Sequence, residues 1–368
     1  MKKTIAVLPG DGIGREVTAE GVKILKQVAN LFGHDFGFVY GTIGHEAIEQ
    51  TGNPLPDDTL HLLRQSDAIL FGAVGHPHYD NNPSLAVRPE QGLLRMRKEL
   101  DLFANIRPIK LFDDLLHASS IKPEVLKGAD ILFFRELTGD VYFGEKGRKD
   151  HHTAYDVMVY SRHEVERIAH LAFQAARSRR KKVTSVDKAN VLESSRLWRQ
   201  VVQEISAQYA DVQLEHLFVD AAAMKLIQNP RSFDVVLTGN LFGDILTDEA
   251  SQIAGSMGML ASASVGHTVG LYEPIHGSAH DIAGKGLANP LASILSAALM
   301  LDLSFGLKKE SMAVVRAVEL TLRQGYRTPD IATGETPDNK ILNTKSMGDA
   351  VGSELEKIVA GEALITET

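Results

Sequence analysis

The chain has 368 residues, of which 44% are hydrophobic, so it can bury a sizeable core, and its length favours two domains over one. Its 39 basic and 47 acidic residues give a formal net charge of −8, and the basic residues are dispersed, which argues against nucleic acid as a partner. The one basic run, RSRRKK at residues 177–182, is interpreted as the cationic end of a helix that begins near Arg162.

Cysteine is absent, which excludes disulfides, thiolate metal ligands and a cysteine nucleophile. The opening MKKTIAVLPGDG has too few apolar residues before its proline for a secretory signal. No apolar run approaches the roughly 18 residues of a membrane span, because polar residues and a proline interrupt the stretch at residues 287–305. We therefore expect a cytoplasmic globular protein without a membrane span.

The first elements in the chain are a strand at residues 4–8, a glycine turn with the sequence PGDGIGRE, and a periodic helix over residues 13–32. This order is typical of the opening unit of an α/β domain. The glycines approach a dinucleotide-binding fingerprint, but Arg15 stands where the third glycine is required. As a tight turn from strand to helix, the segment needs no ligand.

Alternating strands and helices continue along the chain. Strands are expected at residues 36–40, 68–74, 130–134, 157–160, 183–186 and 213–219. Helices are expected near His45 and Leu60, and over residues 162–180, 291–302, 312–324 and 346–358. The stretch from 270 to 290 is too rich in glycine and polar residues for a helix, and its length predicts a functional loop.

Two polar residues follow predicted strands. Lys188 follows the strand at 183–186, and Asp220 follows the strand at 213–219. In open α/β sheets the carboxyl ends of strands carry ligand chemistry. Lys188 is therefore either a proton carrier or a salt-bridged surface residue. Tyr142, in a turn bounded by glycines, is either an acid or an exposed turn residue.

The stretch TGNLFGDILTDEASQIAGSMG, at residues 238–258, holds Asp244 and Asp248 four residues apart. On a helix both carboxylates face the same side, where they could reach one ion. No Lys or Arg occurs between Arg231 and Lys285, so we expect a bound cation to supply the missing positive charge. Ligands that offer only oxygen suit Mg²⁺ or Mn²⁺. The alternative is an ordinary solvated helix face, which the apolar neighbours argue against.

Three arginines are candidates for binding an anion. Arg97 and Arg107 lie in RPEQGLLRMRKELDLFANIRP, at residues 88–108, and Arg135 follows the strand at 130–134. Arginine pairs suit carboxylates, which they bind in a bidentate way. The alternative for the first two is an amphipathic helix with solvated arginines.

Five motifs occur in order: GDGIG, RELTGDVYFG, DKANVL, GNLFGDILTDEASQIAGS and EPIHGSAHDIAGKGLANP. Together they resemble the β-hydroxyacid oxidative decarboxylases, the isocitrate/isopropylmalate dehydrogenase family, nearly end to end. The resemblance implies a two-domain α/β fold that is not the usual Rossmann dinucleotide fold. A first domain, residues 1–102 and 256–368, would bind NAD. A second, residues 103–255, would carry the dimer interface and the metal and catalytic residues, with the active site in the cleft between the domains.

The resemblance also implies roles. NAD and Mg²⁺ or Mn²⁺ would be the cofactors, and the protein would be a homodimer with shared active sites. Lys188 would take the hydroxyl proton of the substrate and Tyr142 would protonate the enol. The metal ligands would be Asp220, supplied by the partner subunit, Asp244 and Asp248. The residues that would bind the substrate are Glu90, Leu93, Leu94, Arg97, Arg107, Arg135 and Asp220.

The cofactor residues implied by the resemblance are His276, Gly277, Ser278, Ala279, His280, Asp281, Ile282, Ala288 and Asn289. Asp281 would accept hydrogen bonds from both ribose hydroxyls and would repel a 2′-phosphate, which predicts a preference for NAD over NADP. His280 is a departure, because relatives commonly have proline there, and it puts the rigidity of this loop in question.

Glu90, Leu93 and Leu94 imply a pocket for an isopropyl group, and hence the NAD-dependent oxidative decarboxylation of 3-isopropylmalate to 4-methyl-2-oxopentanoate and CO₂ in leucine biosynthesis. One alternative is a sibling dehydrogenase that acts on isocitrate, homoisocitrate or tartrate. The other is a non-catalytic regulatory subunit, which we would expect to have lost Lys188, Tyr142 or a metal carboxylate. All of these are present.

Overall fold

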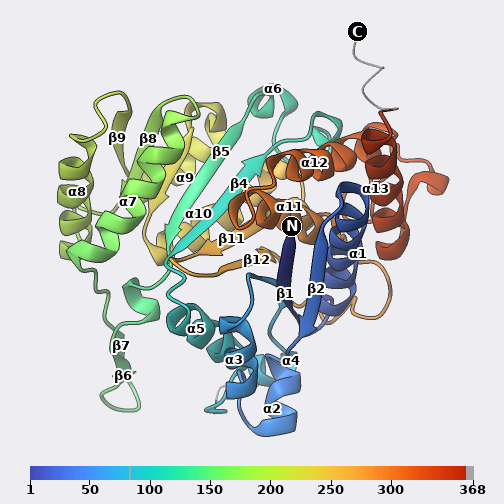
Figure 1. The fold of residues 1–368 in the computed structure, drawn as a ribbon. Helices are drawn as coiled ribbons and strands as arrows, with labels where there is room; N and C mark the ends of the chain where they lie inside the picture. The colour runs from blue at the N-terminus through green and yellow to red at the C-terminus, as the bar shows by residue number, and fades with distance from the viewer. Residues whose placement is uncertain (83, 362–368) are drawn as a thin grey trace. The chain divides into compact units, whose positions relative to one another are not determined.

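The structure is a computed structural model that describes residues 1–82 and 84–361 (Figure 1). The α/β class is confirmed, with thirteen α-helices in this part of the chain. The chain divides into two compact units: unit 1 comprises Met1–Leu100 and the described residues from Gly255 onward, and unit 2 comprises Asp101–Ala254. No helix in the described residues is both long enough and apolar enough to cross a membrane.

The strands of unit 1 lie in the order β2-β1-β3-β12-β11, with β11 antiparallel to β12 and the other pairs parallel. Their bounds are β1 Lys2–Gly10, β2 Asp35–Tyr40, β3 Ala68–Ala73, β11 Ala261–Val265 and β12 Gly270–Pro274. Every residue of β3 and β12 is buried. Continuous burial of this kind is typical of parallel strands that are covered on both faces.

The helices of unit 1 are α1 Gly14–Phe32, α2 His45–Thr51, α3 Asp57–Arg64, α4 Pro77–Asp80, α5 Pro89–Glu99, α11 Leu291–Leu303, α12 Lys308–Arg323 and α13 Thr344–Val359. Helix α1 packs on β1 and β3, and α11 packs on β11 and β12. Helix α11 is buried along most of its length because it also contacts α1 and α12.

The strands of unit 2 lie in the order β4-β5-β10-β8-β9. Strand β4 runs antiparallel to β5, and the other neighbours are parallel. The bounds are β4 Ala104–Lys110, β5 Asp130–Glu136, β8 Lys182–Asp187, β9 Gln213–Phe218 and β10 Val235–Thr238. A separate antiparallel pair is formed by β6 Lys146–Arg148 and β7 Ala154–Asp156.

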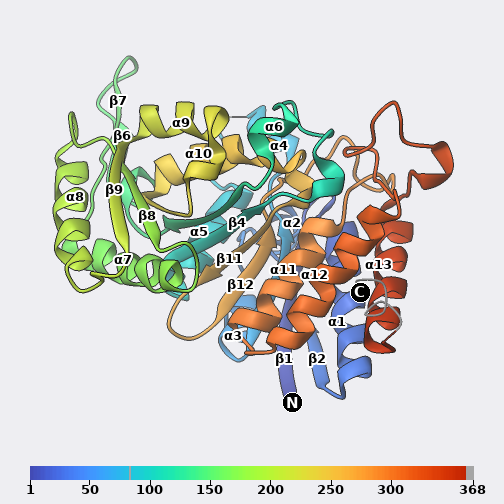
Figure 2. The same ribbon diagram turned by 90° about the horizontal axis from the view of Figure 1, so that it is seen from above.

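The helices of unit 2 are α6 Pro123–Leu126, α7 Arg162–Arg177, α8 Glu193–Ser206, α9 Val219–Gln228 and α10 Asn240–Ala254. Helix α7 packs on β5 and β10, and α10 packs on β4 and β5. Figure 2 shows α9 and α10 side by side, in agreement with their contacts. Short 3₁₀ helices occur at Asp113–Leu115, Asp140–Tyr142, Pro230–Ser232, Met257–Met259 and Asp338–Lys340.

The strand expected at residues 157–160 is wrong. These residues belong to no strand and instead bind the turn that precedes them in the chain: Val157 N–H donates to the carbonyl of Glu145, and the carbonyl of Val159 accepts from Asp140 N–H. Val157 and Val159 are exposed. The apolar residues indicated a strand, although only Tyr160 at the end of the segment is buried.

Several elements were missed from the sequence. Strands β4 and β10 and helix α8 were not expected, and β12 lies in the stretch interpreted as a loop from residue 270. The basic run begins at the last residue of α7, after which Arg179 pairs with Asp130 and Asp234. Its cations therefore also tie α7 to the strands beneath it.

Candidate active site

Polar residues lie at the carboxyl ends of the parallel strands of unit 2, along one edge of the sheet. Arg135 lies near the end of β5, Lys188 directly follows β8, Asp220 follows β9 by two residues, and Asn240 follows β10 by two. The carboxyl ends of parallel strands meet at the same edge, where open α/β sheets bind ligands. The edge expected to carry the chemistry is therefore lined by the expected residue types.

The helix predicted for Asp244 and Asp248 is confirmed, since both lie on α10, one turn apart. The positive charge that we expected from a bound cation is supplied in part by arginines of the same unit. Arg135 Nη1 donates to Asp244 Oδ1 over 2.5 Å, and Arg107 Nη1 lies 3.5 Å from Asp248 Oδ1. Because these arginines come from β4 and β5, more than 100 residues away in the chain, the sequence around α10 gave no sign of them.

The two carboxylates are also less enclosed than expected. The Asp244 side chain is 37% exposed and that of Asp248 is 54% exposed, while Leu246, Thr247 and Ala250 make the buried face of α10. Partial burial raises the pKa of the Asp248 carboxyl, and Arg107 opposes this rise. The surrounding arginines therefore offset only part of the free-energy cost of burying the charged Asp248 carboxylate.

Arg135 is buried beneath α10, and the residues at the start of that helix hold it, a contact that the sequence did not predict. Its Nε and Nη2 donate to Asn240 Oδ1 over 3.1 and 2.7 Å, and Asn240 Nδ2 donates to the carbonyl of Leu137 over 3.0 Å. A Cβ at Gly243 would lie 2.6 Å from Arg135 Cγ. The Arg135 side chain therefore lies against the start of α10 because Asn240 binds its guanidinium and Gly243 has no Cβ in its path. Their signal in the sequence was the motif GNLFGD.

Arg107 and Tyr142 complete this group. Arg107 Nε donates to Asn105 Oδ1 over 2.7 Å, and its Nη1 donates to Thr247 Oγ1 over 2.6 Å. The Tyr142 hydroxyl donates to Asp244 Oδ2 over 2.5 Å. The structure thus brings together five of the expected residues, which we call the carboxylate site: Arg107, Arg135, Tyr142, Asp244 and Asp248.

The turn after β5 presents Tyr142 to α10. The Glu136 carboxylate accepts the N–H groups of Thr138 and Gly139, and burial raises its pKa. Asp140 has φ +72° and accepts from Leu241 N–H over 3.2 Å. The motif RELTGDVYFG is therefore a turn built by its own acidic side chains, and it ends at the first turn of α10.

Lys188 and Asp220 form a second group. Lys188 Nζ donates to Asp220 Oδ1 over 2.6 Å, and this bond lowers the pKa of Asp220. Asp220 lies in the first turn of α9 with its side chain 61% exposed. Within the described residues no group of three side chains is placed to hold a metal ion. The three expected metal ligands are therefore not assembled within this chain.

Buried groups fix the position of Lys188. Its backbone N–H donates to Ser195 Oγ over 3.0 Å. The preceding residue, Asp187, is buried and accepts both Nε and Nη2 of Arg199, whose guanidinium lies 5.0 Å from the centre of the Phe218 ring. The ends of β8 and β9 are therefore linked to each other directly beside the residues that they present.

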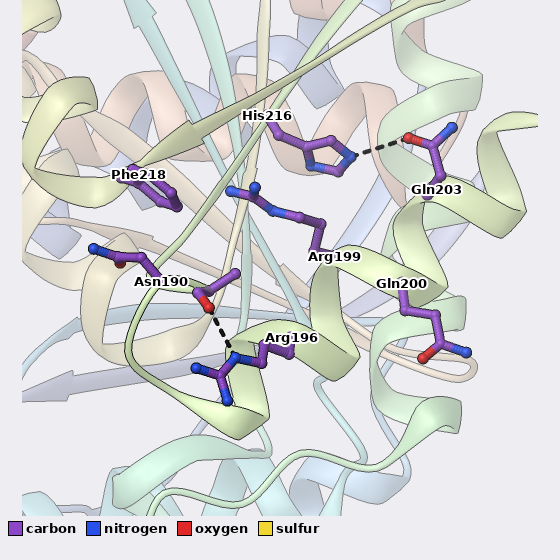
Figure 3. Close-up of a pocket in the computed structure, with 8 residues that line it drawn as sticks. Asn190, Arg196, Arg199, Gln200, Gln203, His216 and Phe218 are labelled. Atoms are coloured by element: carbon purple, nitrogen blue, oxygen red, sulfur yellow. Dashed lines mark hydrogen bonds between the residues drawn. The ribbon is translucent and has the colours of Figure 1, made fainter.

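A hollow of ≈ 550 Å³ lies beside these strand ends. Figure 3 shows Arg199 pointing toward Phe218 and His216, and Arg196 bound to the backbone carbonyl of Ala189. Arg196 also pairs with Glu193. Both arginines are thus already balanced by carboxylates. The lining residues are Ala189, Asn190, Arg196, Arg199, Gln200, Gln203, His216 and Phe218.

In unit 1, helix α5 carries Glu90, Leu94 and Arg97 at spacings of four and three, which place them on one face beside Leu93. Arg97 is buried, so the alternative of a solvated arginine does not hold for it. Its Nη2 donates to Glu273 Oε1 over 3.0 Å, and its Nε is buried without a partner among the described residues. Glu273, on β12, was missed by the sequence reasoning.

The expected cofactor residues lie in the loop after β12, at residues 276–289, which we call the cofactor loop. His276 Nε2 is buried without a partner in the described part of the chain, and burial lowers the pKa of this histidine. Asp281 is exposed. Asn289 Nδ2 donates to Asp330 Oδ2 over 3.1 Å, so Asp330 is a further residue that the sequence reasoning missed.

The glycine turn after β1 docks the cofactor loop. Ile13 N–H donates to the carbonyl of Ser278 over 2.8 Å, and a Cβ at Gly12 would lie 1.9 Å from that oxygen. Gly12 also has φ +56°, which side-chain-bearing residues rarely adopt. Ala288 packs against Ile13 and Val17. The glycines therefore serve the close approach of two backbones.

Together these features define a class: an α/β protein whose unit 2 sheet presents arginines, aspartates, a lysine and a tyrosine beside the carboxyl ends of its parallel strands. Residues 4–351 match the family described as isocitrate/isopropylmalate dehydrogenase. The chain belongs to this family.

Curated relatives match nearly end to end. The 3-isopropylmalate dehydrogenase of Priestia megaterium is 52% identical over 373 residues, which cover 100% of this chain and 99% of that one. That of Geobacillus kaustophilus is 54% identical over 352 residues, 94% of each chain. Members of the family are in general NAD-dependent dehydrogenases that use a divalent metal ion.

Solved structures agree with the fold. The isocitrate dehydrogenase of Methylococcus capsulatus has a TM-score of 0.85 at 32% identity, covering 96% of this chain and 99% of that one. A β-decarboxylating dehydrogenase from Thermococcus kodakarensis has a TM-score of 0.78 at 34% identity, covering 100% of both chains. The fold is therefore the one that the five motifs implied.

Proposed function

We propose that the chain catalyses the NAD⁺-dependent oxidative decarboxylation of 3-isopropylmalate to 4-methyl-2-oxopentanoate and CO₂, a step of leucine biosynthesis. The observation that carries this proposal is the carboxylate site, where two arginines, a tyrosine and two aspartates converge at the carboxyl edge of the unit 2 sheet. The names of the full-length relatives support the substrate.

The residues of the carboxylate site fit a divalent ion. Asp244 and Asp248 offer only oxygen atoms on one helix face, and partial burial raises the pKa of Asp248, a cost that a bound cation would remove. Mg²⁺ or Mn²⁺ would be held by these two carboxylates and by Asp220 of a second copy. When bound, the ion polarises the substrate hydroxyl and the nicotinamide ring accepts the hydride.

The side chains of this chain have distinct tasks. Arg107 and Arg135 bind and orient the two carboxylates of the malate. Lys188 takes the hydroxyl proton as the carbinol C–H leaves as hydride, and the resulting β-keto acid loses CO₂. Tyr142 then gives a proton to the carbon that carried the carboxylate. The proton taken by Lys188 and the proton given by Tyr142 balance, so NADH and CO₂ are the only co-products.

The substrate's alkyl group meets α5 in this proposal. Leu93 and Leu94 are half-buried on the face that also carries Glu90. Isopropyl methyls packed on leucine gain roughly 0.8 kcal/mol per buried methylene-sized group. A third carboxylate, as in isocitrate, would be desolvated there and repelled by Glu90. The two leucines therefore favour 3-isopropylmalate over the sibling substrates.

The cofactor loop fits NAD. The buried, unpartnered Nε2 of His276 is a polar atom that a ligand could satisfy, and the exposed Asp281 can accept both ribose hydroxyls. We propose that Asp281 selects NAD⁺ over NADP⁺, because its charge repels a 2′-phosphate.

A homodimer completes the site in this proposal. Asp220, Met224 and Ile227 share one face of α9, and the two apolar side chains are 59% and 39% exposed. Helix α10 packs beside α9 (Figure 2), and its Ile245 is 58% exposed. An exposed apolar patch beside Asp220 favours burial against a second copy. Because Lys188 is bonded to Asp220, both would act in the site of the partner.

The test is turnover with purified protein. With 3-isopropylmalate, NAD⁺ and Mg²⁺, we expect one NADH and one CO₂ per substrate consumed, and far slower turnover with NADP⁺. EDTA should abolish the reaction and added Mg²⁺ or Mn²⁺ should restore it, because the carboxylates alone cannot polarise the hydroxyl. Full turnover in chelator, or NADH formation without CO₂, would contradict the proposal.

A further inference from the structure

Three histidines of unit 1, which we call the histidine stack, link the cofactor loop to the turn after β3. The His45 and His76 rings are stacked with centroids 4.0 Å apart, and His280 meets His76 edge-on at 4.5 Å. His280 Nε2 donates to the carbonyl of Gly75 over 2.8 Å. The residue that departs from the family's usual proline is therefore bound on two sides.

One hydrogen bond within the stack determines which ring nitrogen of His76 carries the proton. His76 Nδ1 accepts from His78 N–H over 3.1 Å at the start of α4, so a neutral His76 carries its proton on Nε2. Protonation of Nδ1 would remove this acceptor and would place a positive charge between two other imidazoles. The stack is thus complete only when His76 is neutral.

The turn that holds His280 is itself anchored. The buried Asp11 carboxylate accepts from Gly75 N–H over 2.9 Å and from His45 N–H over 3.0 Å. A Cβ at Gly75 would lie 3.3 Å from Ser278 Oγ, so this turn also touches the cofactor loop directly. Asp281, which follows His280, is therefore positioned through a chain of contacts that ends in the core of unit 1.

We propose that His76 and His280 are positioning residues for the cofactor: together they hold the cofactor loop so that Asp281 presents its carboxylate to the ribose of NAD. The inference rests on the proposed function, because it assumes that this loop binds NAD. It assigns a role to His76, which lies outside the cofactor residues expected from the sequence.

The arrangement predicts a pH dependence. Burial and the neighbouring His45 and His280 lower the pKa of His76. A lowered pKa keeps His76 neutral at pH 7, so NAD binding is fully supported above the ordinary histidine pKa of about 6.5. It is lost as the pH falls through the pKa of His76, which lies below that ordinary value. The other titratable and charged groups that face the stack are Asp11, Glu49, His78, Tyr79 and Glu90.

The test measures NADH affinity by fluorescence titration, without substrate or metal. At pH 8, His280→Ala should weaken NADH binding about tenfold, the loss expected for one hydrogen bond and its packing. His280→Gln should recover most of the affinity, because its amide can donate to the carbonyl of Gly75. His61→Ala, an exposed histidine of the same unit, is the matched control and should change nothing.

A pH series separates positioning from a merely structural role. The unmutated protein should lose NADH affinity several-fold between pH 7.5 and 5.5, whereas His76→Phe, which keeps a ring but cannot titrate, should give a nearly flat profile. At saturating NAD⁺, kcat of His76→Phe should stay near the unmutated value. Unchanged affinity in His280→Ala, or tighter binding at low pH, would overturn the inference. Failure of the unmutated protein to bind NADH would instead overturn the proposed function.

Discussion

The carboxylate site of unit 2 and the cofactor loop of unit 1 are held in opposite ways. In the carboxylate site, side chains bind side chains: Arg135 and Tyr142 both reach Asp244. In the cofactor loop, the backbone does most of the binding, through Ile13 N–H to Ser278 and through Gly284 and Gly286 N–H to the Glu16 carboxylate. The first depends on the identity of each side chain, whereas the second depends largely on glycines that let two backbones approach each other.

The largest effect should come from removing single side chains near the unit 2 strand ends. Lys188→Met and Asp244→Asn should each lower kcat by about 10³-fold or more, since each removes a proton carrier or a metal ligand.

If Lys188 acts in the partner's site, refolding the two inactive variants together should restore about a quarter of the activity, because half of the dimers would hold one intact site.

The control for that experiment is each variant refolded alone, which should stay inactive. Light scattering should report a dimer for all preparations, so that lost activity is not lost assembly. A mixture that remains inactive while mixed dimers are demonstrated would mean that Lys188 and Asp244 serve the same chain's site. Near-normal turnover in Lys188→Met would mean that another group takes the proton.

A smaller effect should follow from disturbing the backbone docking of the cofactor loop. Gly12→Ala would force a Cβ to within 1.9 Å of the Ser278 carbonyl, so the loop must move. We expect the KM for NAD⁺ to rise about tenfold, equivalent to roughly 1.4 kcal/mol, with kcat nearly unchanged.

The matched variant is Gly33→Ala at the end of α1. Gly33 has φ +73°, close to the +56° of Gly12, but nothing lies within 4 Å of its Cβ position. Each variant should lose about 1 kcal/mol of stability from the left-handed backbone, and Gly12→Ala should lose more because Ser278 must also move. Only Gly12→Ala should weaken NAD⁺ binding. An equal rise in KM for both would show that general destabilisation, and not docking, is responsible.

The same contrast explains what the sequence could predict. The spacing of Asp244 and Asp248 predicted their helix, and the apolar run before Lys188 predicted its strand, because both signals are local. The partners of Asp244 could not be found in this way. Arg107 lies on a strand that contains Pro108, and Arg135 lies on a different strand, 109 residues before Asp244 in the chain. Charge balance across a sheet is set by tertiary contacts, so the local absence of Lys and Arg was misleading.

The cofactor loop shows a second limit. The glycine turn packs against Ser278, which joins residues more than 260 positions apart, and the sequence contains no local sign of this contact. Strand β12 was missed because Gly270–Pro274 is short and its burial comes from β3 and α11. The resemblance to a family supplied the roles of these residues, which composition and periodicity could not.

The most direct test of the proposed function is a side-by-side measurement of kcat/KM for 3-isopropylmalate and isocitrate, with NAD⁺ and Mg²⁺ saturating. The half-buried Leu93 and Leu94 beside Glu90 should accept the isopropyl group and reject a carboxylate. We predict a preference for 3-isopropylmalate of at least about a hundredfold, or roughly 2.7 kcal/mol. Equal values, or a preference for isocitrate, would contradict the proposed substrate and favour a sibling dehydrogenase.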